Sequence, residues 1–137
     1  MKSVEVHPVR YVIARMANGE DILGSLNRAV EECGIRNALI VSGVGSVTSY
    51  HVHVVETTNL PPGNLYWKEE SPFDVVSITG LIMGGRVHAH IVLSDRERTV
   101  AGHLEPGCRV LTFCIVTVAV LKDGDAVADL DRYEIPG

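Results

Sequence analysis

The sequence lacks most of the features that mark membrane, disulfide-bonded or aromatic-rich chains. Only 5% of its 137 residues are aromatic, so its core must consist mainly of Val, Ile and Leu, the first two of which favour β-strands. The three cysteines, Cys33, Cys108 and Cys114, are odd in number and form no Cys-x-x-Cys pair, which predicts buried free thiols rather than a disulfide framework or a thiolate zinc site. The longest apolar stretch, residues 110–121, is interrupted by two threonines and is too short to span a membrane.

The charge balance of the chain is unfavourable for binding DNA. Twelve Lys and Arg residues stand against 17 Asp and Glu residues, giving a formal net charge of −5. This sign opposes the phosphate contacts that dominate non-specific DNA affinity. The N-terminus carries no apolar signal core, so we expect a cytoplasmic protein with no membrane partner.

The chain has the size of a single domain, and one helix is predicted near its start. With 46% hydrophobic residues, it can close one core, which predicts a single domain over 1–137 with its core at about 10–122. Asn18 resembles a helix N-cap with Asp21 reaching back to it. Apolar residues recur at helical spacing over 22–33, and Gly34 supplies a left-handed stop.

The rest of the chain predicts strands separated by Gly, Pro and Asn clusters. The expected strands are 9–15, 37–42, 47–56, 73–83, 86–94, 99–105 and 108–122. Residues 59–64 read as a loop, and the glycine segment 42–46 as a tight turn between strands. The fold class that follows is α+β, with a largely antiparallel sheet and one packed helix.

Two turn signals, a Gly-Gly pair at 84–85 and the loop 95–98, fix which side chains share a face. The first turn sets Leu81 opposite His88, and the second sets His90 directly opposite His103. Directly opposed residues have β-carbons about 4.5–5.5 Å apart. His88 and His90 are two residues apart on one strand and so share a face. The pattern therefore brings the imidazoles of His88, His90 and His103 together.

The other face of this three-strand meander supports the register, because it carries only apolar residues and glycine. These are Val76, Ile78, Gly80, Ile82, Val87, Ala89, Ile91, Leu93, Val100, Gly102 and Leu104. A slip of one residue would move a whole strand to the opposite face and destroy this surface. His88, His90, His103 and Glu105 are thus predicted to share the non-core face.

Three neutral imidazoles suit zinc or another divalent transition metal, and three protein ligands leave a fourth position open. Glu105 is placed to act as a second-shell partner, an extra ligand or a general base, and the sequence does not choose among these roles. The competing interpretation is that these histidines are only polar residues on a solvated face of the sheet and bind no metal. His51 and His53 repeat the His-x-His pattern, but no third histidine pairs with them locally, so they are the weaker metal candidate.

A family resemblance adds to this reading. The motif Val87–Asp95, with Gly102-His103-Leu104 and Pro106-Gly107-Cys108, resembles the signature of the PPC domain family, also called DUF296. The same pattern covers residues 19–23, 41–46 and 73–80, so the resemblance spans roughly residues 10–122. It implies an α+β fold, assembly as a homotrimer, and a histidine cluster that holds a metal, usually zinc, at His88, His90 and His103.

Plant members of this family carry an AT-hook, an Arg-Gly-Arg-Pro element that reads the DNA minor groove, and this chain has none. They also carry an Arg-Phe-Glu type motif where this chain has Pro72-Phe73-Asp74, and as a type they lack the histidine cluster. These departures favour the metal-bearing prokaryotic type over a DNA-binding role.

Two function classes follow as hypotheses. The leading hypothesis is a metal-binding homotrimer with an open three-histidine site for a small ligand. In one form of it the protein is an enzyme, in which the metal activates water and Glu105 assists as a catalytic residue. The alternative is a DNA-binding or regulatory, nucleoid-associated module whose metal is structural or sensory. The strand 111–120, apolar on nearly both faces, independently favours oligomerisation.

Overall fold

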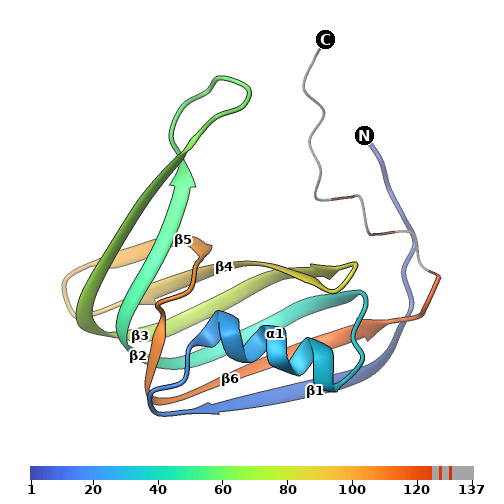
Figure 1. Ribbon diagram of the computed structural model, residues 1–137, viewed down its shortest axis with the longest axis horizontal. Helices are drawn as coiled ribbons and strands as arrows, with labels where there is room; N and C mark the ends of the chain where they lie inside the picture. The colour runs from blue at the N-terminus through green and yellow to red at the C-terminus, as the bar shows by residue number, and fades with distance from the viewer. Residues whose placement is uncertain (125–126, 128–129, 131–137) are drawn as a thin grey trace.

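A computed structural model describes residues 1–124, 127 and 130, and the rest of the predicted 1–137 domain lies outside the described residues. One helix and six strands form its regular structure (Figure 1). In chain order they are β1 (Pro8–Ala17), α1 (Ile22–Glu32), β2 (Ala38–Val55), β3 (Asn64–Met83), β4 (Arg86–Ser94), β5 (Thr99–Leu104) and β6 (Arg109–Leu121). In the part of the chain described, no helix is long and apolar enough to cross a membrane.

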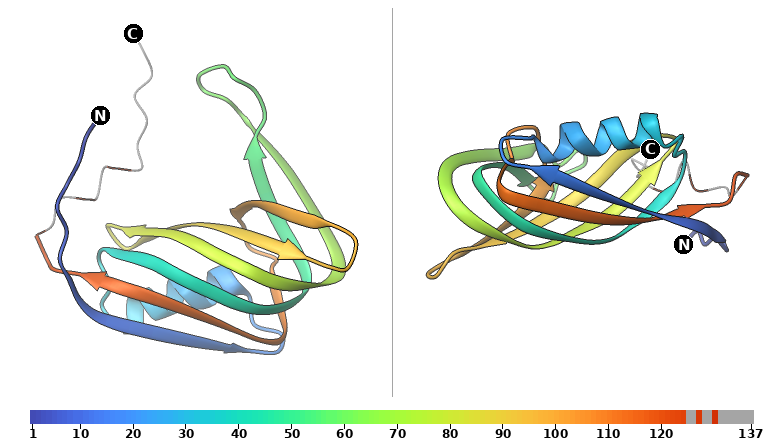
Figure 2. Two further views of the ribbon diagram at one scale, coloured as in Figure 1. Left: turned by 180° about the vertical axis from the view of Figure 1, so that it is seen from behind. Right: turned by 90° about the horizontal axis from the view of Figure 1, so that it is seen from below.

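The six strands form one sheet in the order β1-β6-β2-β3-β4-β5, and every pairing is antiparallel. Helix α1 lies across one face of the sheet (Figure 2). It buries Ile22, Leu26 and Val30 in the same core as strand residues such as Ile78 and Val116. The predicted α+β architecture with one packed helix is therefore confirmed.

The start of α1 differs from the prediction, and its end agrees with it. Asp21, not Asn18, is the N-cap, and its Oδ2 accepts a hydrogen bond from the Gly24 N–H at 2.9 Å. The Asn18 side chain instead donates to the Leu111 carbonyl at 2.6 Å. Gly34 has φ +61°, and the left-handed conformation of this residue ends the helix as expected.

The strand assignment differs from the prediction in two segments, the glycine segment of β2 and the first half of β3. Residues 42–46 do not form a turn; they lie within β2, which absorbs the glycines through irregularities in its pairing with β6. Asn64, which was placed in the loop 59–64, and residues 65–72, which were assigned no structure, form the first half of β3, which pairs with the second half of β2. This half of β3 mixes apolar and charged residues because it is a largely exposed strand, not because it is a loop.

The meander from β3 to β5 has the predicted register, with one exception. Leu81 pairs with His88, and His90 pairs with His103. Gly84 and Gly85 have φ +59° and +77°, the positive values that a tight type I′ turn requires. The expectation that Val76 faces the core was wrong: a bulge between Val75 and Ser77 turns it outward, and it is 54% exposed.

Strand β2 also pairs with β5, which the strand order alone would not place beside it. Val52 pairs with Leu104, and His53 pairs with His103. Strands β2, β3, β4 and β5 thus close into a ring at one end of the sheet. Gly102 permits this closure, because a Cβ there would lie 2.8 Å from the His53 carbonyl oxygen.

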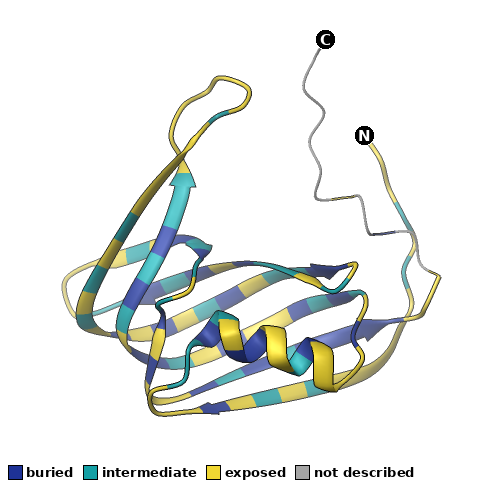
Figure 3. Cartoon of the chain, viewed as in Figure 1, coloured by how far each residue is buried: buried dark blue, intermediate teal, exposed yellow. Residues whose placement is uncertain are grey.

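The sheet face opposite α1 carries exposed apolar side chains. Tyr11 and Ile13 on β1 are 69% and 68% exposed, and Val44 and Phe113 on the neighbouring strands are also exposed. The pairing of Val44 with Ile115 and of Ala17 with Phe113 puts these side chains on one face. Figure 3 shows the alternation of buried and exposed residues along the strands. No described element of this chain covers that face.

The cysteine prediction holds in part. All three cysteines are free, and Cys108 and Cys114 are buried, where burial raises the pKa of each thiol to about 11. Cys33 is exposed, because it caps the C-terminus of α1 instead of facing the core.

Candidate metal centre

Four histidines from three strands meet where the ring of strands closes. His88 and His90 lie on β4, His103 lies on β5, and His53 lies on β2. His103 is paired on one side with His90 and on the other with His53. The three-imidazole juxtaposition predicted for His88, His90 and His103 is therefore present, and a fourth ring extends it.

The predicted trio is compact. Ring centroids of His88 and His103 lie 5.0 Å apart, those of His90 and His103 lie 5.7 Å apart, and those of His88 and His90 lie 5.6 Å apart. The planes of His88 and His90 are nearly parallel at 2°, whereas His103 is inclined to them by 71° and 72°.

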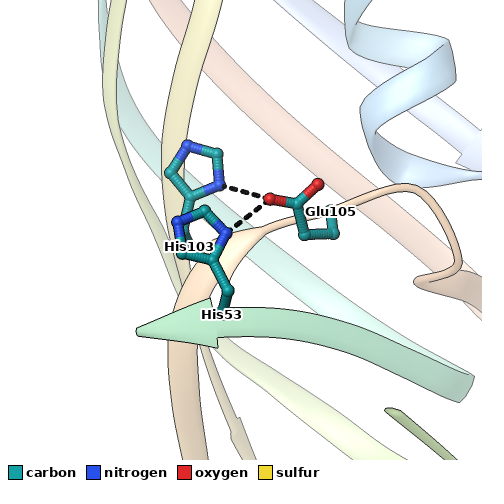
Figure 4. Close-up of side chains that lie close together, drawn as sticks. All are labelled: His53, His103 and Glu105. Atoms are coloured by element: carbon teal, nitrogen blue, oxygen red, sulfur yellow. Dashed lines mark hydrogen bonds and ion pairs between the residues drawn. The ribbon is translucent and has the colours of Figure 1, made fainter. Parts of the chain in front are cut away.

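A second group of donors overlaps with this trio. Among the described residues, His53, His103 and Glu105 are the set whose metal-ligating atoms all lie within 4.8 Å of one another. Glu105 Oε1 lies 2.5 Å from Nδ1 of His53 and 3.1 Å from Nδ1 of His103 (Figure 4). Glu105 follows β5 directly, and its N–H donates to the His51 carbonyl at 3.1 Å. One carboxylate thus holds two imidazoles.

The histidines form the polar side of a pocket of about 420 Å³. His53, His88, His90 and His103 line it together with the end of β2 and the following loop. That loop side is mainly apolar, consisting of Val54, Val55, Pro61 and Pro62 beside Gly63 and Asn64. The pocket therefore pairs a nitrogen-rich surface with an apolar wall.

Burial tunes two of these imidazoles. It lowers the pKa of His90, with smaller effects in the same direction from His88 and His53. It also lowers the pKa of His103, where His53 and His88 act in the same direction and the Glu105 carboxylate opposes them. Lowered pKa values keep both rings neutral, which is the form that binds metal ions.

His53 is the residue that the sequence reasoning underrated. The statement that no third histidine pairs near it was wrong, because its partner comes from β5, 50 positions along the chain. The available signal was the alternation of His51 and His53 with the buried Tyr50 and Val52. His51 takes no part in the cluster of rings; its Nδ1 lies 2.8 Å from the Pro106 carbonyl.

Comparison with known proteins supports the family resemblance. A family model described as the Plants and Prokaryotes Conserved (PCC) domain matches residues 4–122. Two bifunctional GlmU proteins from Synechococcus strains are 25% identical to this chain over 118 residues, which are 85% of the chain. The matched region is only 17% of the length of those relatives.

Three solved structures share the fold. A metal-containing protein from Archaeoglobus fulgidus superposes with a TM-score of 0.78 at 23% identity, covering 89% of this chain and 86% of the other. A plant- and prokaryote-conserved (PPC) protein from Pyrococcus horikoshii gives 0.76 at 22%, covering 91% and 87%. A proposed DNA-binding protein from Bacteroides thetaiotaomicron gives 0.70 at 18%, covering 85% and 83%.

The lowered pKa values predict a pH dependence of stability. Because the folded pKa of His103 lies below the unfolded value of about 6.5, the unfolded chain binds more protons below that pH. The metal-free protein should therefore lose stability as the pH falls through about 6.5. Urea unfolding at about pH 7.5 and 5.5 should show a smaller loss for His103→Asn than for the wild type. His7→Asn, outside the cluster, is the control, and equal losses in all three proteins would contradict the assignment.

Proposed function

This chain belongs to the Plants and Prokaryotes Conserved (PCC) domain family, and we propose that it binds a divalent transition metal ion through His88, His90 and His103. The ion leaves one coordination position open to a small ligand. The observation that carries the proposal is the spacing of the three rings, 5.0–5.7 Å between centroids. Imidazoles bound at about 2.0–2.1 Å to one tetrahedral ion have centroids about 5 Å apart, so the three rings are close enough to share one ion. His88 and His90, whose planes are parallel at 2°, would have to turn about their side-chain bonds to direct a nitrogen at it.

The overlapping set of His53, His103 and Glu105 fits an ion less well. Two ligands of one tetrahedral ion stand about 3.3 Å apart. Glu105 Oε1 and His53 Nδ1 are 2.5 Å apart, too close for two ligands of one ion and nearer to the distance of about 2.7–2.9 Å of a charge-assisted N–H···O hydrogen bond. We therefore assign these contacts to hydrogen bonding and metal coordination to His88, His90 and His103.

The chemistry of the donors favours zinc or a similar ion. Imidazole suits zinc, copper, iron and nickel, whereas magnesium and calcium prefer oxygen ligands. A bound ion of this kind supplies a Lewis-acidic position at the histidine side of the pocket. The name of the Archaeoglobus fulgidus neighbour, a metal-containing protein, is consistent with this proposal.

Metal binding is directly testable on protein purified without a histidine tag. The wild type should bind one zinc ion per chain in competition with a chromophoric chelator. His88→Ala, His90→Ala and His103→Ala should each weaken binding by more than the 10–100-fold typical of losing a second-shell partner. His7→Ala is the matched control. Wild-type affinity in all three variants would refute the proposed ligands.

The oligomeric part of the proposal is a homotrimer, as the family resemblance implies. The exposed apolar face formed by Tyr11, Ile13, Val44 and Phe113 supports it, because monomeric proteins rarely expose contiguous apolar patches of large size. A second copy of this chain is the simplest cover for a face that no described element shields.

Trimer formation can be measured by sedimentation. The wild type should have three times the chain mass of 14.8 kDa. Ile13→Asp and Phe113→Asp should shift it toward one chain mass, since a buried unpaired carboxylate opposes association. Glu31→Lys, on the exposed side of α1, should leave the mass unchanged. A wild type that sediments as a monomer would refute the trimer.

The alternative function is DNA binding, which the name of the Bacteroides thetaiotaomicron neighbour suggests. The net charge of −5 opposes it. We therefore expect weak retention of duplex DNA even at low salt. Tight binding whose affinity falls steeply with salt concentration would favour the alternative over the small-ligand site.

A further inference from the structure

We propose that Glu105 is a positioning residue that fixes the Nδ1–H tautomer of His53 and His103, so that His53 offers a bare Nε2 as a hydrogen-bond acceptor beside the open metal position. This inference rests on the proposed metal site and deepens it. It chooses one of the three roles that the sequence left open for Glu105 and gives His53 a role of its own.

The hydrogen bonds set the tautomers. Glu105 Oε1 lies 2.5 Å from His53 Nδ1 and 3.1 Å from His103 Nδ1. An ionised carboxylate only accepts hydrogen bonds, so each Nδ1 must donate. In a neutral imidazole the second nitrogen is then unprotonated. His103 therefore has Nε2 free to bind an ion, and His53 has Nε2 free to accept a hydrogen bond.

The two rings are also held by packing. His53 stacks on His103 with 4.4 Å between centroids and lies against Tyr66 at 4.9 Å. The side chains of His53 and Glu105 are only 16% and 19% exposed. Tyr66 on β3 and His103 on β5 are the partners of His53 on its two neighbouring strands, and their ring contacts restrict the rotation of the His53 ring before any ligand enters.

The backbone places the carboxylate between the two rings. The pairing of His53 with His103 brings both rings to one side of the ring of strands. The N–H of Glu105 donates to the His51 carbonyl, and Asp21 Oδ1 accepts from the Gly107 N–H at 2.6 Å. Glu105 is thus anchored at its own N–H and two residues later.

These constraints define a class of ligand. His53 lines the same pocket as the three proposed ligands but is held by Glu105 rather than aimed with them at one ion. A small molecule that offers a lone pair to the ion and an O–H or N–H to His53 would use both groups. The apolar wall of Val54, Val55 and Pro62 would contact its remaining carbon skeleton.

The tautomers can be read without metal. Long-range ¹H–¹⁵N spectra of histidine-labelled apoprotein at about pH 8 should show Nδ1 protonated and Nε2 bare in both His53 and His103. Glu105→Ala should return His53 to the Nε2–H tautomer that free side chains favour. Glu105→Gln should retain the wild-type pattern, because both hydrogen bonds end on one oxygen, which an amide carbonyl can replace. Glu97→Ala, on the β4–β5 loop, is the control.

Cobalt(II) affinity and its visible spectrum give the second measurement. Glu105→Ala should weaken binding 10–100-fold through misorientation of His103, and Glu105→Gln should recover most of the loss. His53→Ala should change affinity by no more than a few-fold and leave the spectrum unchanged; His53→Asn serves if the alanine variant does not fold.

The outcomes separate this inference from the proposed function. An Nε2–H tautomer at His53 or His103 in the wild type would overturn the inference while leaving the metal site intact. Loss of binding in His53→Ala equal to that in His90→Ala would overturn it too, since His53 would then be a ligand. Failure of the wild type to bind cobalt at all, with the expected tautomers present, would instead refute the proposed function.

Discussion

The antiparallel contact between β2 and β5 is the constraint on which the candidate site depends. Strand β2 is 18 residues long; it pairs with β6 along its first part and with β5 near its end, while β3 accompanies it on the other side. Two residue pairs, Val52 with Leu104 and His53 with His103, make the contact with β5. Without them, a trio of histidines would stand on an open sheet, and Glu105 would have only one imidazole to hold.

Local signals were enough to predict the fold class and the juxtaposition of His88, His90 and His103. Two turns fixed the register from β3 to β5, because side chains in a strand alternate with a period of two and only one register keeps the apolar face intact. The same reasoning missed everything that depends on distant pairing. The first half of β3 places Leu65, Tyr66 and Trp67 directly before Lys68, Glu69 and Glu70, so it shows no alternation of apolar and polar residues. The bulge at Val75 and Ser77 breaks the alternation that placed Val76 inside. The position of His53 follows from a contact between strands 50 residues apart, which no local period reveals.

The chemistry of the cluster favours neutral nitrogen donors over charge. Burial lowers the pKa of His90 and His103, so these rings are available as ligands without first losing a proton. The single carboxylate of the cluster, Glu105, is engaged with Nδ1 atoms. The proposed metal site would discriminate against magnesium and calcium by ligand type, even though the chain as a whole is negatively charged.

The close approach of Gly102 to the β2 backbone lies at the seam, by which we mean the contact between β2 and β5 that closes the ring of strands. His53 and His103, which pair across the seam, also line the pocket. The seam consists of only two residue pairs, although Val52 and Leu104, which form one of them, are fully buried. Opening it would separate His53 from His103 and leave Glu105 with a single partner, while the large β1-β6-β2-β3 portion stayed folded. Any molecule that binds only the closed form would stabilise it by RT ln(1 + L/Kd), where L is the free ligand concentration. Ligand binding across the seam and closure of the seam would therefore be thermodynamically coupled.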